Sequence, residues 1–190
     1  MANKLNNLLI NIFEDKNFET YKPSLVKEAF SNETVLNYNF SMFIFVISES
    51  SFNNIVFTNV NFCGSYCFES QFNNCTFNNT KFRKADWSDC QFINCQFNDC
   101  LFTRAEIDET IFQSCNFTRV NFIASTLYEC TFQDCFFKKL KAAPNKTLEM
   151  CIIDSKFYKE KDQKAIPLND EDDFLKILNE MNAFEDNYLE

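Results

Sequence analysis

The sequence predicts an all-β solenoid, a fold in which short coils of chain stack on one another. Two features predict it. From Phe52 to Phe137 every fifth residue is large and apolar, with one lapse at Cys67. The residue two places before each of these is almost always small. A period of five matches neither the 3.6 residues of a helical turn nor the two-residue alternation of a strand, so the pattern marks a repeat.

Each repeat buries one large and one small side chain and leaves three residues facing water. A coil that turns a corner every five residues regains its direction after about four corners. One coil cannot bury its own phenylalanine rings, so the coils must stack at about 4.8 Å, the separation of paired strands. With 25 phenylalanines in the chain, we expect a dry aromatic core.

The repeat unit is best seen in residues 75–79, Cys-Thr-Phe-Asn-Asn, and 95–99, Cys-Gln-Phe-Asn-Asp. It resembles the unit of the pentapeptide-repeat family, which is a small residue, a polar residue, Leu or Phe, and two further polar residues. The resemblance covers residues 50–139 closely. It implies a right-handed quadrilateral β-helix, and it says much less about function.

The ends of the chain leave this pattern, and 190 residues suit one domain with caps. We expect an N-terminal helical or irregular cap over 1–49. Within it Phe30, Val35, Phe40 and Phe45 step by five in a shifted phase, so an irregular first coil is a second interpretation of this segment. The β-helix is predicted over 50–157, with a loop or degenerate half coil at 138–149. Residues 158–190 are predicted to be a linker and a C-terminal helix.

The C-terminal helix is predicted from its start signal and its apolar stripe. Four acidic residues at 170–173 crowd its first turn, where the helix dipole favours negative charge. Two interpretations stay open: a cap over the last coil in a monomer, or the interface of a homodimer. The residues of this predicted cap or dimer helix are Phe174, Leu175, Ile177, Leu178 and Met181.

Composition argues against an enzyme. The chain has no histidine, which excludes a Ser-His-Asp triad, a Cys-His dyad and imidazole metal ligands. Its one glycine, Gly64, cannot build a dinucleotide fingerprint or a phosphate loop. We therefore expect no catalytic residues, no cofactor and no metal site.

Cysteine positions indicate packing. Seven of the ten cysteines fall in the small inward position, where Cys acts as a small hydrophobe, and no CxxC occurs. The stacked set Cys75, Cys95, Cys115 and Cys135 leaves a minor redox alternative open. Reduced packing cysteines favour the cytosol. No secretory segment is expected, and residues 40–47 are too short to span a bilayer, so the sequence predicts a soluble cytoplasmic protein with no membrane contact.

One side of the predicted coil differs from the others. Sorting the large positions into four columns gives three columns of phenylalanine and a fourth of Cys67, Trp87, Ile107 and Leu127. Outward positions over this fourth column carry acidic residues and no basic one. They form the candidate interaction face: Glu69, Asp86, Asp89, Glu106, Asp108, Glu109 and Glu129.

Two interpretations of this acidic side are open. The neighbouring side carries Lys81, Arg83, Lys84 and Arg104 and no acid, and ion pairs around the corner from Arg83 or Lys84 would make the charges ordinary solvated surface. Alternatively, a partner offsets the repulsion of carboxylates stacked at about 4.8 Å, which is roughly 1 kcal/mol for each neighbouring pair in water.

Two function classes follow. The first is a non-enzymatic protein-interaction or structural module that binds a protein partner and has no direct contact with nucleic acid. The second is implied by the resemblance, because the family includes quinolone-resistance and toxin-immunity proteins that mimic DNA and bind type II topoisomerase. This chain is similar to them in length, in its Cys-x-Phe-x-x-Cys runs and in its net charge of -9. Carboxylates every ~4.8 Å compare with phosphates every ~3.4 Å along a DNA strand.

Overall fold

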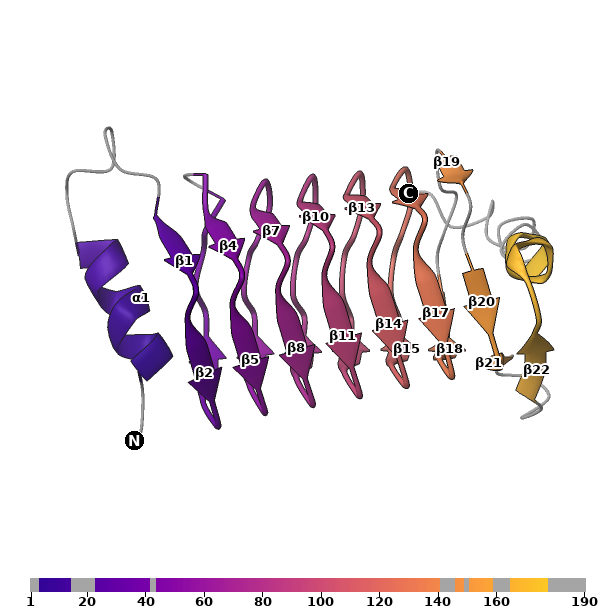
Figure 1. The fold of residues 1–190 in the computed structure, drawn as a ribbon, viewed down its shortest axis with the longest axis horizontal. Helices are drawn as coiled ribbons and strands as arrows, with labels where there is room; N and C mark the ends of the chain where they lie inside the picture. The colour runs from indigo at the N-terminus through magenta and orange to yellow at the C-terminus, as the bar shows by residue number, and fades with distance from the viewer. Residues whose placement is uncertain are drawn as a thin grey trace, which may run out of the picture.

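The predicted all-β solenoid is confirmed. A computed structural model describes residues 4–14, 23–41, 44–140, 146–148, 151–158 and 165–177. Successive coils stack along one axis, with a helix at each end (Figure 1). Each coil contributes one strand to each of three parallel sheets and closes its fourth side without a strand.

We name the four sides in chain order. Face A is the sheet of β1 (Ser24–Val26), β4 (Val46–Ser48), β7 (Tyr66–Phe68), β10 (Asp86–Ser88), β13 (Glu106–Asp108), β16 (Thr126–Tyr128) and β19 (Lys146–Leu148). Face B is the sheet of β2 (Ala29–Ser31), β5 (Ser51–Asn53), β8 (Gln71–Asn73), β11 (Gln91–Ile93), β14 (Ile111–Gln113), β17 (Thr131–Gln133) and β20 (Cys151–Ile153). Face C is the sheet of β3 (Thr34–Leu36), β6 (Val56–Thr58), β9 (Thr76–Asn78), β12 (Gln96–Asn98), β15 (Asn116–Thr118), β18 (Phe136–Lys138), β21 (Ser155–Tyr158) and β22 (Ala165–Leu168). Face D is the stack of isolated bridges through Asn39, Asn61, Lys81, Leu101 and Asn121.

The five-residue pattern builds the core as expected. From β4 onward each strand pairs with the strand twenty residues later, so that Phe72, Phe92 and Phe112 lie above one another. Their rings stack with centroids 4.7 and 5.1 Å apart. Rings from neighbouring faces meet edge to face, as Phe92 and Phe97 do at 5.6 Å. The interior is therefore a continuous aromatic stack.

Corners are made by residues with a left-handed backbone. The residue two places after each large inward residue has a positive φ, such as 54° at Asn94 and 48° at Glu109. Asn and Asp tolerate this conformation better than most residues, which explains the many asparagines at these positions. At these corners the coils are also joined by backbone hydrogen bonds. The backbone N–H of Asn94, for example, donates to the backbone carbonyl of Gln113 on the next coil at 2.9 Å.

The repeat begins earlier than residue 50. Strands β1 to β3 form a first coil over 24–36, within the range where we expected a helical or irregular cap. Ser24 pairs with Val46, so the first and second coils are 22 residues apart in register, whereas later coils are 20 residues apart. The two extra residues explain the shifted phase of the large residues in the first coil. The extra length brings Phe45 into a position where later coils have a small residue, and its ring stacks on Phe40 at 4.2 Å.

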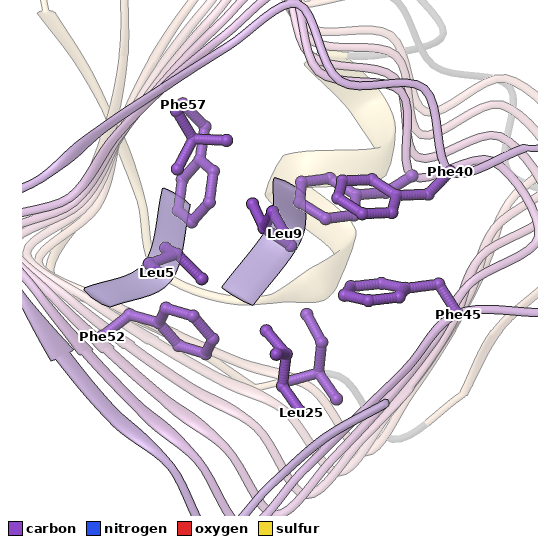
Figure 2. Close-up of a pocket in the computed structure, with 10 residues that line it drawn as sticks. Leu5, Leu9, Leu25, Phe40, Phe45, Phe52 and Phe57 are labelled. Carbon is purple, nitrogen blue, oxygen red and sulfur yellow. The ribbon is translucent and has the colours of Figure 1, made fainter. Parts of the chain in front are cut away.

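Helix α1 (Lys4–Glu14) closes the N-terminal end of the core. Leu5 and Leu9 point from α1 into the first coil, toward Phe40, Phe45 and Phe52 (Figure 2). Both leucines are buried, and only a void of about 10 Å³ remains between the helix and the rings. The helix thus covers aromatic surface that would otherwise face water, as a solenoid end requires.

Two acidic residues of the first coil anchor α1. Glu28 and Glu33 occupy small inward positions of the repeat, and Glu33 is 5% exposed. Its carboxylate accepts hydrogen bonds from the backbone N–H groups of Leu5 at 2.9 Å and Asn6 at 3.1 Å. The Lys4 ammonium forms an ion pair with the Glu28 carboxylate, with Nζ 2.6 Å from Oε2. These contacts satisfy N–H groups that have no partner within the helix.

Replacing Glu33 with alanine should lower the free energy of unfolding by about 1–3 kcal/mol, because two N–H groups at the buried helix start lose their acceptor. Urea unfolding followed by circular dichroism measures the change. Glu14→Ala, at the exposed far end of the same helix, is the control and should change stability little. Equal effects of the two substitutions would contradict the anchoring role of Glu33.

The C-terminal end keeps the twenty-residue register through β21, which lies at the end of the predicted range of 50–157. Strand β19, within the range predicted as a loop or degenerate half coil, pairs with β16, and β20 and β21 follow in phase. Strand β22, which we did not predict, then runs antiparallel to β21 and carries Pro167 at the edge of the sheet. Residues 171–177 form a helix beyond it (Figure 1).

The cysteines pack as expected. All seven in small inward positions are buried and free, and Cys95 donates its thiol proton to the carbonyl of Phe72 at 3.2 Å. Cys75, Cys95 and Cys115 are stacked neighbours whose thiols interact. Burial raises the pKa of Cys100 and Cys130 to about 12. These two thiols therefore stay protonated at neutral pH, and thiols are poor nucleophiles in that form.

Candidate functional site

Face A carries all seven residues of the predicted acidic face. Glu69, Asp89, Glu109 and Glu129 are exposed and occupy the corner position after each strand, where φ lies between 48° and 53°. Successive coils place them in one row, which we call the acidic column. On the first two coils the equivalent corner positions are Lys27 and Glu49, so Glu49 continues the acidic column and Lys27 does not. The Lys27 ammonium lies 3.4 Å from the Glu49 carboxylate.

A second group of carboxylates lies beside this column on the strands. Asp86 is the register partner of Glu106, and Ser88 is the partner of Asp108. Burial raises the pKa of Asp86, and the charges of Glu106 and Asp108 raise it further. Burial also raises the pKa of Asp108, with a smaller contribution from Glu106. The like charges on β10 and β13 therefore interact unfavourably at neutral pH.

The ion pairs that would neutralise face A across its corner are not formed. Within the described residues, ion pairs join Lys4 to Glu28, Lys27 to Glu49 and Arg119 to Asp99. Neither Arg83 nor Lys84 pairs with Asp86 or Asp89, so the expectation of charge pairing around the corner is wrong. The Arg119 guanidinium, 2.6 Å from Asp99 on face C, lowers the pKa of that carboxyl.

On β7 of face A, aromatic side chains adjoin the acidic residues. Tyr66 and Phe68 project outward from β7, with ring centroids 5.9 Å apart, and Tyr66 is exposed. Carboxylates beside exposed aromatic rings are common at protein-binding surfaces, where aromatic residues supply much of the binding energy. Face A thus combines charge with apolar contact area.

Face D, which shares an edge with face A, has the opposite charge. Lys81, Arg83, Lys84 and Arg104 are exposed there, and face D carries no acid within the described residues. Its chain closes with turns, such as the hydrogen bond from the Ser65 N–H to the Phe62 carbonyl at 3.0 Å. The solenoid therefore presents an acidic and a basic side across one corner.

Part of the predicted cap or dimer helix is seated on the last coils. Phe174 and Ile177 are buried, and the Phe174 ring lies 5.3 Å from that of Phe137. Leu175 packs at the margin of the core. Leu178 and Met181 lie outside the described residues. The buried side chains cover the aromatic core in this chain itself, which favours the cap.

His, Cys, Asp and Glu side chains of the described ranges form no group of three or more that could hold a metal ion. None of the helices described is long and apolar enough to cross a membrane.

The comparison with known families decides what the repeat is. A family described as pentapeptide repeats matches residues 70–107 and 100–138, with eight copies of the unit. Residues 70–138 of the chain are pentapeptide repeats. No curated protein matches its sequence.

Solved structures similar to this chain include Rfr23, QnrB1 and HetL. Rfr23, a pentapeptide-repeat protein from the cyanobacterium Cyanothece 51142, has 11% identity and a TM-score of 0.43 over 75% of this chain and 98% of its own. QnrB1, a plasmid-mediated fluoroquinolone resistance protein, has 12% identity and a TM-score of 0.37 over 84% of this chain and 99% of its own. HetL is a pentapeptide-repeat protein from the cyanobacterium Nostoc sp. strain PCC 7120 that is involved in heterocyst differentiation regulation. It has 9% identity and a TM-score of 0.35 over 83% of this chain and 98% of its own.

Removing two carboxylates should stabilise the protein at neutral pH. Because the raised pKa values of Asp86 and Asp108 mean that the folded state holds their protons more tightly than the unfolded state, deprotonation costs stability. Asp86→Asn with Asp108→Asn should therefore raise the free energy of unfolding by up to about 1 kcal/mol at neutral pH. The gain should disappear as pH falls through the raised pKa values toward the ordinary value of 3.8.

Asp99→Asn is the control, since the pKa of Asp99 is lowered and its deprotonated form stabilises the fold. It should lose stability at neutral pH, and the loss should vanish at acidic pH. Urea unfolding across this pH range measures both variants. A stability loss in the Asp86 and Asp108 variant at neutral pH would contradict the like-charge interaction on face A.

Sequence reasoning located face A but missed two features. The anchor of Glu28 and Glu33 had a signal, because both acids stand two places before a large residue, where later repeats have a small one. Face D also has an open hollow of about 400 Å³, lined in part by Cys63 and Arg83. It had a weaker signal in Cys63 and Gly64, two small neighbours at outward positions. Their effect depends on how the chain turns at this side, which the period of the repeat does not determine.

Proposed function

We propose that this chain is a non-enzymatic protein-interaction module that binds a cationic surface of a partner protein through face A. The observation that carries the proposal is the acidic column with its second row on β10 and β13. The charges of Glu106 and Asp108 raise the energy of the Asp86 carboxylate, and within the described residues only Glu49 of the column is paired. A cationic partner removes this cost and steers its own approach by long-range attraction.

Packing supports the same conclusion. The core is filled by rings, and the voids near Trp87 and under α1 have volumes of only about 10 Å³. Such spaces leave no room for a substrate. The proposed function therefore uses an outer surface, and the rigid stack of coils holds the carboxylates at fixed spacing. A preorganised surface spends less free energy on ordering when it binds.

The experiment compares two matched double substitutions. Asp89→Asn with Glu109→Gln removes two carboxylates from corner positions of face A, and Asp134→Asn with Asp154→Asn removes two from corner positions of face B. The wild-type chain and both variants are immobilised and exposed to lysate of the source cells, and proteins retained by the wild type are then purified and titrated. We expect the face A variant to bind at least about tenfold more weakly, a loss of about 1.4 kcal/mol.

The face B variant should bind its partner like the wild type. Equal weakening in both variants would show a general charge effect and overturn the assignment to face A. Equal binding by all three chains would overturn it as well.

A narrower candidate is that the partner is a type II topoisomerase such as DNA gyrase, with face A imitating a DNA backbone. The regular spacing of the acidic column, about 4.8 Å against about 3.4 Å for phosphates of one DNA strand, favours it. The cations of face D count against it, since a DNA-binding channel is cationic on every wall that faces the duplex.

Purified chain added to a gyrase supercoiling assay, with and without a quinolone, tests this candidate. Protection of supercoiling or reduced drug-induced cleavage by the wild type, lost in the face A variant and kept in the face B variant, is the expected result. No change in either reaction at micromolar concentration would exclude gyrase and leave the wider proposal standing.

A further inference from the structure

We infer that face D holds a second binding site, a groove that takes an acidic peptide segment. The groove is an open hollow of about 400 Å³ that crosses four successive coils. It is lined by Ser41, by Asn61 and Cys63, by Lys81 and Arg83, and by Leu101 and Thr103. This site is separate from face A, and its test does not depend on the function proposed there.

The shape of the groove follows from the local sequence. On the coil that carries Cys63, the next residue is Gly64, which has no side chain and a φ of 71°. On the following coil, the equivalent outward positions are Arg83 and Lys84, which are long and exposed. Small residues on one coil beside long cationic residues on the next produce a hollow with a basic wall.

The charge of the groove is uncompensated. Lys81, Arg83, Lys84 and Arg104 form no ion pair within the described residues, and face D carries no carboxylate there. Lys84 and Arg104 stand at equivalent corners of consecutive coils, so their like charges repel. A ligand with several carboxylates relieves this repulsion, and the guanidinium of Arg83 can hold a carboxylate through two parallel hydrogen bonds.

An acidic peptide fits this surface better than a nucleic acid. The carboxylates of Asp86 and Glu106, at the first residues of β10 and β13, lie just across the corner on face A, and they repel a ligand whose negative charges follow one another every ~3.4 Å. A peptide can place its few carboxylates over the cations alone. It can also set an apolar side chain on Leu101, which is 38% exposed.

Cys63 provides a direct readout of occupancy. It lines the groove and is half-buried, Cys151 is exposed on face B, and the remaining cysteines are buried. Iodoacetamide, which is uncharged, should therefore alkylate Cys63 and Cys151 first. The probe is a synthetic peptide of eight glutamates, and mass spectrometry measures the rate at each cysteine with and without it at low ionic strength.

The peptide should slow alkylation of Cys63 and leave Cys151 unchanged. At about ten times its Kd the rate at Cys63 should fall about tenfold, because only the unoccupied groove reacts. Lys81→Glu with Arg83→Glu should abolish this protection. Lys138→Glu with Lys156→Glu, which makes the same charge change on face C, should keep it.

Three results would overturn the inference. They are unchanged reactivity of Cys63 at saturating peptide, equal slowing at both cysteines, and protection that survives in the Lys81 and Arg83 variant. A single-stranded oligothymidylate of equal charge is run in parallel. If it protects Cys63 as well as the peptide does, the groove is a general polyanion site and the assignment to an acidic peptide is wrong.

Discussion

Replacing Phe97 with alanine should lower the free energy of unfolding by about 3–5 kcal/mol. Phe97 is fully buried in the middle of the solenoid. Its ring stacks between Phe77 and Phe117, each at 4.9 Å, and meets the edges of Phe92 and Phe102. The alanine leaves a cavity between the two neighbouring coils. These coils cannot move together to fill it, because their strands β9 and β15 are hydrogen-bonded to β12.

Gln96→Ala is the matched control for Phe97→Ala. Gln96 precedes Phe97 on β12 and is exposed on the outside of face C. Its replacement should change stability by no more than about 0.5 kcal/mol. Urea unfolding followed by circular dichroism measures both variants. If Phe97→Ala cost no more than Gln96→Ala, the aromatic stack would not be what holds the coils together.

Trp87→Ala should cost about 3–5 kcal/mol as well, and its effect should depend on Cys67. Trp87 is the one tryptophan in the chain and lies directly above Cys67 in register. The indole meets the edge of Phe82 at 4.5 Å and stacks on Phe92 at 5.1 Å. It occupies space that the small Cys67 leaves, and a void of only about 10 Å³ remains beside them.

A double-mutant cycle tests this compensation. With Trp87 present, Cys67→Leu should destabilise by about 1–3 kcal/mol, because the void is too small for the added atoms. In the Trp87→Ala background the same change should recover part of the lost stability, which gives an interaction energy of about 0.5–3 kcal/mol. Simple additivity of the two changes would show that the residues do not share this space.

The core was predictable from sequence because the repeat determines it. Once every fifth residue must be buried, stacking is the only way to remove phenylalanine rings from water, and the register follows from four repeats per coil. The acidic face was predictable for the same reason. Outward positions keep a constant phase, so Asp86, Glu106 and their neighbours had to share one side.

The ends were less predictable because they break the period. A two-residue change of register in the first coil shifts the phase of Phe30 and Phe40, so the step of five was visible there but its continuity with the later coils was not. Strand β22 has no repeat signal at all. Its position depends on the exposed edge of β21, which exists only once the solenoid has formed.

The localisation of a bound partner on the solenoid tests the central claim most directly. The claim is that face A is the binding surface, and hydrogen exchange of the chain with and without its purified partner locates the contact. We predict slower exchange in the segments of β7, β10, β13 and β16, with β8, β11 and β14 on face B unchanged. Protection confined to face B or face C, with face A exchanging as in the free chain, would contradict it.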